Sequence, residues 1–153
     1  MLQQGGAKIG GGSPNQTTNI FVIDTNVLIS GILYNGTAGA ALEHIIIHQR
    51  VILSDYILEE FMRCLRIVRP KQPHKWTREL RKYLETYITD DGDEVIVEDV
   101  RDMKDEPLIR LAARHEAAII TGDKDLLEYR GAAKVVVLSV GEYLELFVGE
   151  GLY

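Results

Sequence analysis

The sequence has few cysteines, no long apolar run and no signal-peptide pattern. It has one cysteine, Cys64, so no internal disulfide framework can form, and a reducing compartment is expected. No apolar run approaches the roughly 18–20 residues that a membrane-spanning helix needs. The N-terminus also lacks the basic-then-apolar pattern of a signal peptide. These absences favour a cytoplasmic protein with no membrane partner.

Composition supports a single folded domain. The chain has 153 residues, of which 46% are hydrophobic and 26% are charged, and these values exclude a disordered, collagen-like or coiled-coil chain. Residues 1–18 are rich in Gly, Gln, Ser, Thr and Asn and have too little apolar surface to offset the entropy of ordering. We therefore expect a flexible Gly-rich tail at 1–18 and one domain at 19–153.

Charge is unevenly distributed along the chain. The net charge is −6, which argues against general nucleic-acid binding. Residues 63–82 nevertheless hold eight of the seventeen basic residues and one acid, whereas residues 83–106 hold ten acids and two bases. Two solvated faces of opposite sign would explain this pattern without any function.

Short apolar runs alternate with helical periodicity. Strands are predicted at 20–23, 51–53, 95–97, 118–120 and 134–138. Helices are predicted at 27–33, 37–48, 55–68, 77–88, 108–116 and 141–147, with a short helix ending at Leu127. This alternation predicts an α/β fold in three layers, α/β/α, with a five-stranded parallel sheet. Ligands bind such sheets outside the carboxyl ends of the strands.

Three carboxylates are predicted at that edge of the sheet. Asp24 ends the first strand, Asp123 follows the 118–120 strand after a Thr-Gly turn, and Asp105 precedes a helix. Each alone has an ordinary explanation as a turn residue or a helix cap. Together, like charges raise one another's pKa unless a cation neutralises them, and oxygen ligands suit Mg²⁺ or Mn²⁺.

Glu60 is a fourth candidate because of its place on the predicted helix at 55–68. It borders the apolar stripe of that helix, so a half-buried acid in need of a partner is expected. Glu59 falls on the outer side, where it is predicted to pair with Arg63 at i+4.

Smaller polar groups are expected to support the site. The Asn26 side chain could hydrogen-bond a carboxylate, the Thr121 hydroxyl could reach the same cluster, and Asp125 is a further acid at the rim. Asp102 is a weaker candidate.

The segments around these residues, in their order and spacing over roughly 20–147, resemble the PIN-domain family. The matching motifs are Phe-Val-Ile-Asp24-Thr-Asn26, Ser54-Asp-Tyr-Ile-Leu-Glu-Glu60-Phe, Asp102-Met-Lys-Asp105-Glu-Pro-Leu and Ile-Thr121-Gly-Asp123-Lys-Asp125. The most similar branch is the prokaryotic group described as toxins of toxin–antitoxin pairs. The resemblance implies a PIN-like five-stranded sheet and an acidic quartet of Asp24, Glu60, Asp105 and Asp123 that binds Mg²⁺ or Mn²⁺. It also implies hydrolysis of RNA phosphodiester bonds, an antitoxin partner and a possible homodimer.

Other chemistries fit less well. His44 and His48 lie at i and i+4, but Ile45, Ile46 and Ile47 leave no acid between them, so ordinary helix histidines are expected rather than zinc ligands. Cys64 lies on an apolar stripe and is expected in the core. No glycine-rich turn matches a Walker A loop.

The basic block is a candidate for guiding RNA toward an acidic site. Lys71, Lys75 and Arg78 would attract phosphates, and Trp76 would stack on an unpaired base, although Trp76 could equally pack in the core or at a dimer contact.

The sequence therefore predicts a metal-dependent endoribonuclease, with two alternatives. The first is a non-catalytic RNA- or protein-binding module that keeps the pocket for stability or docking. The second is a phosphoryl-transfer or receiver-like domain, which also places acids at strand ends. A phosphatase of that kind would need a second Asp two residues after the first, and that position is Asn26.

Overall fold

The computed structural model describes residues 19–71, 75, 76, 78, 80, 88–90, 106–129 and 135–149. The predicted tail at 1–18, the predicted strand at 95–97, and the candidate acids Asp102 and Asp105 lie outside these residues.

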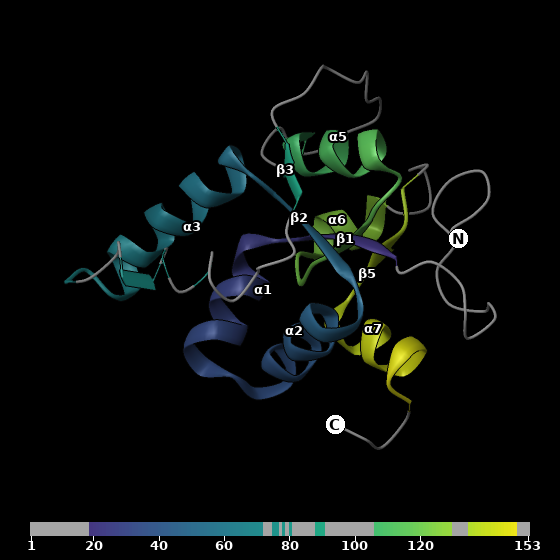
Figure 1. Ribbon diagram of the computed structural model, residues 1–153, viewed down its shortest axis with the longest axis horizontal. Coiled ribbons are helices and arrows are strands. Elements are labelled where there is room, and N and C mark those ends of the chain that lie inside the picture. The colour runs from purple at the N-terminus through teal and green to yellow at the C-terminus, as the bar shows by residue number, and fades with distance from the viewer. Residues whose placement is uncertain are drawn as a thin grey trace.

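A parallel sheet forms the centre of the fold (Figure 1). Its strands are β1 (Ile20–Ile23), β2 (Arg50–Ser54), β3 (Ile88–Asp90), β4 (Ala118–Ile120) and β5 (Val137–Leu138), in the order β3-β2-β1-β4-β5. The pairing places Val22 beside Ile52 on one side and Ile119 on the other. All three side chains are fully buried, as expected for the apolar strands of a sheet covered on both faces.

Four strands form where the sequence predicts them, and the remaining strand corrects the prediction. Ile88–Asp90 pairs with β2, although the predicted helix at 77–88 extends into it. Ile88 and Thr89 are β-branched, and β-branched residues favour a strand when a neighbouring strand is available. Arg78 and Leu80 are helical, in agreement with the earlier part of that prediction, and Lys75 and Trp76, which precede the predicted start, are helical too.

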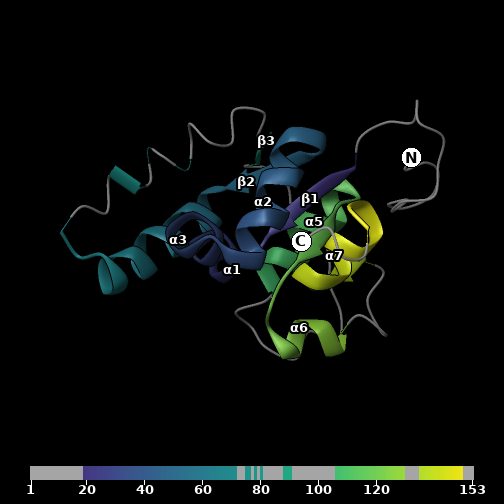
Figure 2. The same cartoon turned by 90° about the horizontal axis from the view of Figure 1, so that it is seen from below.

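Helices cover the sheet on both faces. They are α1 (Thr25–Ile29), the π-helical η1 (Ser30–Tyr34), α2 (Gly36–His48), α3 (Asp55–Val68), α5 (Glu106–His115), α6 (Lys124–Tyr129) and α7 (Val140–Phe147). α2 packs against α7 on one side of the sheet, and α5 packs against β1 and β4 on the other (Figure 1). α3 contacts α1, and its far end extends away from the sheet (Figure 2).

Side-chain caps and residues with positive φ fix several helix ends. The Ser54 hydroxyl accepts a hydrogen bond from the Ile57 amide at 3.2 Å and caps α3. Ser139 and Glu142 form a reciprocal capping box at α7. The turn into α2 uses left-handed φ values at Asn35 and Gly36, and a side chain at Gly39 would collide with that of Asn35.

Aromatic packing holds α7 on the sheet. The ring of Phe21 meets that of Tyr143 edge to face at 5.3 Å between centroids, and Phe147 lies 5.9 Å from Phe21. Pairs of this kind contribute about 0.5–1.5 kcal/mol each beyond their buried area. Among the described helices, none is long and apolar enough to cross a membrane.

Candidate functional site

The carboxyl ends of β1 and β4 bring Asp24 and Thr121 together. The Asp24 amide donates to the Ile120 carbonyl at 2.9 Å, which continues the pairing of the two strands by one residue. The buried Thr121 hydroxyl donates to Asp24 Oδ2 at 2.7 Å and accepts a hydrogen bond from the Asp123 amide at 3.0 Å. One hydroxyl therefore links the two residues after β1 and β4.

Asp123 directly precedes α6 and serves as its cap. Its Oδ1 accepts a hydrogen bond from the Asp125 amide at 2.8 Å, and its carbonyl accepts one from the Leu127 amide at 3.0 Å. One carboxylate oxygen of Asp123 thus acts as an ordinary helix cap. The same residue still lies close enough to Asp24 for the two charges to repel each other.

Burial raises the pKa of the Asp24 carboxyl above its ordinary value of 3.8. The Asp123 charge raises it further. The hydrogen bond from Thr121 and the backbone amides of Thr25 and Asn26 oppose this shift, because they favour the ionised form. Asp24 is therefore a half-buried carboxylate that its surroundings only partly stabilise as an anion.

Two predicted supporting residues lie further out. Asn26 is exposed and acts on Asp24 through its backbone amide, in place of the side-chain contact that the sequence suggests. Asp125 is exposed on the first turn of α6, where it contributes its amide to the Asp123 cap.

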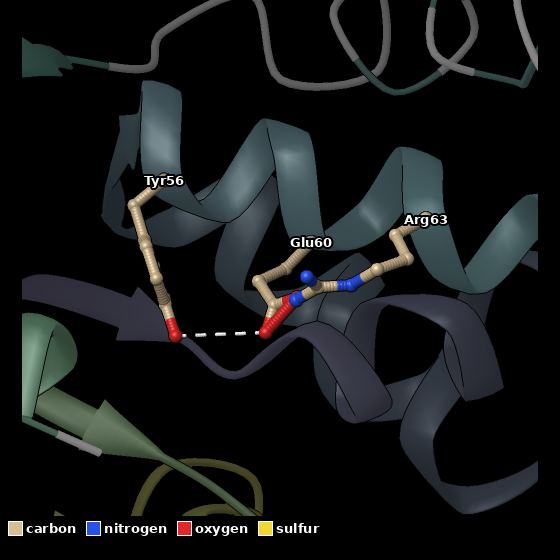
Figure 3. A network of polar contacts seen from close by, with 3 residues as sticks. All are labelled: Tyr56, Glu60 and Arg63. Carbon is tan, nitrogen blue, oxygen red and sulfur yellow. Dashed lines mark hydrogen bonds and ion pairs between the residues drawn. The ribbon is translucent and has the colours of Figure 1, made fainter. Parts of the chain in front are cut away.

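Glu60 is half-buried on α3, as its place beside the apolar stripe predicts. Its carboxylate forms an ion pair with Arg63, and the Tyr56 hydroxyl donates to Glu60 Oε2 at a long 3.5 Å. The side chains of Tyr56 and Glu60 point from α3 toward the turn that follows β1 (Figure 3). The prediction that Arg63 pairs with Glu59 is therefore wrong. Arg63 pairs with Glu60, three residues before it, and not with the exposed Glu59, four residues before it.

Tyr56 is a neighbour of the site that the sequence analysis missed. It precedes Glu60 by four residues on α3, and residues four apart on a helix share a face. That spacing could have identified it.

The described part of the chain contains no group of three His, Cys, Asp or Glu side chains close enough to hold a metal ion. Asp24 and Asp123 lie together, and Glu60 lies on the neighbouring α3. The position of Asp105, the remaining member of the predicted quartet, lies outside the described residues. Metal binding by the four acids stays a prediction.

Other residues singled out from the sequence have structural surroundings. His44 Nδ1 lies 2.7 Å from the Tyr143 hydroxyl between α2 and α7, and the rings of His44 and His48 are 4.3 Å apart. Burial and the neighbouring His48 lower the pKa of His44. Cys64 is partly buried against the core.

The basic block lies at the far end of α3 and beyond it. Lys71, Lys75 and Arg78 are exposed, as RNA guiding would require. Trp76 instead packs against the core, with Lys75 Nζ 5.6 Å from its ring centroid.

The site stands where the strand order of the sheet reverses. From β1 the chain passes to β2 on one side, whereas β4 lies on the other side of β1. Asp24 follows β1 and Thr121 follows β4, so both lie at the edge where open α/β sheets bind ligands. The fold and the site together define an α/β protein with two neighbouring carboxylates, Asp24 and Asp123, at its topological switch point.

Comparison with known proteins identifies the family. The family model described as "PIN domain" matches residues 21–125, about two thirds of the sequence, and the chain belongs to the PIN-domain family. A chain of the crystal structure of VapBC2 from Rickettsia felis, bound to a DNA fragment from their promoter, has a similar fold. The TM-score is 0.58 at 12% sequence identity, over 78% of this chain and 98% of that chain. A comparison with curated proteins found no match.

Proposed function

We propose that this PIN-domain protein is a Mg²⁺- or Mn²⁺-dependent endoribonuclease. The observation that carries the proposal is the carboxylate of Asp24, which is half-buried beside Asp123 and bonded to Thr121 at the switch point of the sheet. Burial and the nearby Asp123 charge raise the pKa of Asp24, and a bound divalent ion would stabilise both carboxylates as anions.

The donor set fits a hard divalent ion. Asp24, Asp123 and Thr121 present only oxygen atoms, which Mg²⁺ and Mn²⁺ prefer. We propose that Asp24 and Asp123 hold the ion and that Glu60 and Asp105 complete the acidic quartet. When bound, such an ion lowers the pKa of a water and neutralises charge on the phosphate.

The protein's own residues orient the acids. The Thr121 hydroxyl fixes the rotamer of Asp24, and the backbone of Asp125 fixes that of Asp123. Asn26 and Asp125 stand at the rim, where they would border the substrate. The exposed Lys71, Lys75 and Arg78 would hold the RNA backbone, because an acidic crevice alone repels a polyanion.

We further propose that the protein is the toxin of a toxin–antitoxin pair. Membership of the PIN-domain family and the similarity in fold to a chain of the VapBC2 structure support this role. A cognate antitoxin would then be the protein partner, and a homodimer stays a prediction.

The test is cleavage of single-stranded RNA with Mg²⁺, with Mn²⁺ and with chelator. Cleavage should need the metal and should be lost in Asp24→Asn, which keeps the shape of the side chain. Glu43→Gln on the exposed face of α2 removes a charge elsewhere and should cleave normally. Metal-independent cleavage, or full activity of Asp24→Asn, would refute the proposal. Binding of RNA without any cleavage would favour the non-catalytic module.

A further inference from the structure

Exposed basic residues lie at the far end of α3 and in the residues that follow it. Arg66, Arg69, Lys71, Lys75 and Arg78 are all exposed. Within the described ranges, none of these five cations forms an ion pair with a carboxylate. The net charge of the whole protein is −6, so this basic surface is opposite in sign to the rest of the molecule. A basic surface of this kind favours a polyanionic partner.

One exposed aromatic ring borders this surface. Tyr34, the last residue of η1, is 57% exposed, and the guanidinium carbon of Arg69 lies 5.4 Å from its ring centroid. Arg69 is also fixed by a hydrogen bond of 3.0 Å from its Nη1 to the Val68 carbonyl. Since more than half of Tyr34 is accessible with Arg69 over the ring, part of its aromatic surface stays open to solvent.

This combination fits a nucleotide better than a purely apolar ligand. An exposed aromatic ring offers a stacking platform for a base, and an adjacent arginine offers donors to a phosphate. Trp76, the aromatic residue that the sequence suggests for this role, packs against the core. Tyr34 has the accessibility that stacking requires.

We propose that Tyr34 and Arg69 form a binding site for one unpaired nucleotide of the RNA substrate, with the base on Tyr34 and the phosphate on Arg69. The inference rests on the proposed ribonuclease function and adds a second point of contact to it. It also identifies the substrate as single-stranded at this position, because a paired base cannot stack on a side chain.

The fold places this nucleotide site away from Asp24 and Asp123. α3 begins directly after β2, at the carboxyl edge of the sheet, and Arg69 follows its last residue. Arg69 follows Glu60 of the proposed quartet by nine residues, which is about 13 Å along a helix, so the substrate must extend beyond the acids to reach both sites. A dinucleotide has a single phosphodiester, which would lie at the acids, so it has no second phosphate for Arg69.

The experiment measures binding of a fluorescent single-stranded RNA of 12 nucleotides to the full chain in chelator, by anisotropy at several salt concentrations. Tyr34→Phe keeps the ring and should bind as the native protein does. Tyr34→Leu keeps apolar volume without the ring and should weaken binding about 5- to 150-fold, the loss of one base–aromatic stack. Arg69→Gln should lower the slope of log affinity against log salt by about 0.7, the loss of one phosphate contact on a single strand.

A second arm separates this inference from the proposed function. Cleavage of the 12-nucleotide RNA should depend on Tyr34 through KM, whereas cleavage of a dinucleotide should be the same for Tyr34→Leu and the native protein. Equal RNA affinity of Tyr34→Leu and the native protein would overturn the nucleotide site, even if Asp24→Asn abolishes cleavage and the ribonuclease function stands. Equal losses in Tyr34→Phe and Tyr34→Leu would overturn it too, because stacking does not need the hydroxyl. Absence of cleavage in the native protein would refute the ribonuclease, and the anisotropy result would still decide the nucleotide site.

Discussion

Thr121→Val tests the hydroxyl that links Asp24, after β1, to Asp123, after β4. Valine matches threonine in shape and removes only the hydroxyl, which donates to Asp24 and accepts from the Asp123 amide. A hydrogen bond to a charged group contributes about 1.5–3 kcal/mol, and a buried amide left without its acceptor costs about 1 kcal/mol. Because Thr121 is fully buried, water cannot replace the lost hydroxyl. We expect the free energy of unfolding to fall by about 2.5–4 kcal/mol.

Urea unfolding at pH 7 in chelator measures this loss. The midpoint should fall while the slope against urea stays constant, since the surface exposed on unfolding does not change. Thr121→Ser is the matched control because it keeps the hydroxyl and loses one methyl group, for about 1 kcal/mol. In an Asp24→Ala background, Thr121→Val should lose only the smaller part that belongs to the Asp123 amide.

Equal stabilities of Thr121→Val and Thr121→Ser would refute this reasoning. That result would mean that the hydroxyl contributes nothing and that Asp24 is held by its backbone amides alone. The role of Thr121 in orienting Asp24 for metal binding would fail with it.

Three further predictions follow from the charges of the molecule. Because the folded state raises the pKa of Asp24, the stability from this group is present below pH 3.8 and is lost as the pH rises through the raised value. Asp24→Asn should therefore raise Tm at pH 7 without metal and abolish the stabilisation by Mn²⁺; a lower Tm would contradict it. Burial and His48 lower the pKa of His44 from 6.5, so the stability it contributes is present above pH 6.5 and lost as the pH falls through the lowered value. Urea midpoints between pH 7 and 5 should fall less in His44→Gln, and an unchanged profile would exclude His44. Arg63→Gln should change stability by less than about 1 kcal/mol, because Arg63 is exposed, yet should tighten Mn²⁺ binding in calorimetry if Glu60 belongs to the metal site.

Most of the sheet and the place of Asp24 at its carboxyl edge could be predicted because they depend on local signals. A run such as Ile20–Ile23 is apolar and β-branched, so it is buried between two neighbouring strands whatever the loops do. Parallel pairing then requires that Asp24, after β1, lies beside Thr121, after β4. The contact between the two residues follows from topology and needs no knowledge of side-chain packing.

The features that could not be predicted depend on packing between distant segments. The strand Ile88–Asp90 exists because β2 offers a partner, which its own three residues do not reveal. The choice of Arg63 between Glu59 and Glu60 is a matter of one helical position, since i+3 and i+4 neighbours are almost equally close. Arg63 selects the half-buried acid, where an ion pair is less screened by water than at the exposed Glu59.

Asp123 shows that a structural role and a chemical role can belong to one residue. A carboxylate has two oxygen atoms, and the start of α6 uses Oδ1 of Asp123 for its cap. The same helix start fixes the carboxylate near Asp24, so capping holds two negative charges close together at the switch point. Topology provides the crevice in any sheet with this strand order, but the charge in it comes from these side chains. A cap that served stability alone would not need a second acid beside it. Burial raises the pKa of Asp24 and the Asp123 charge adds to it, so a half-buried carboxylate beside a second acid is the physical reason to look for a cation there.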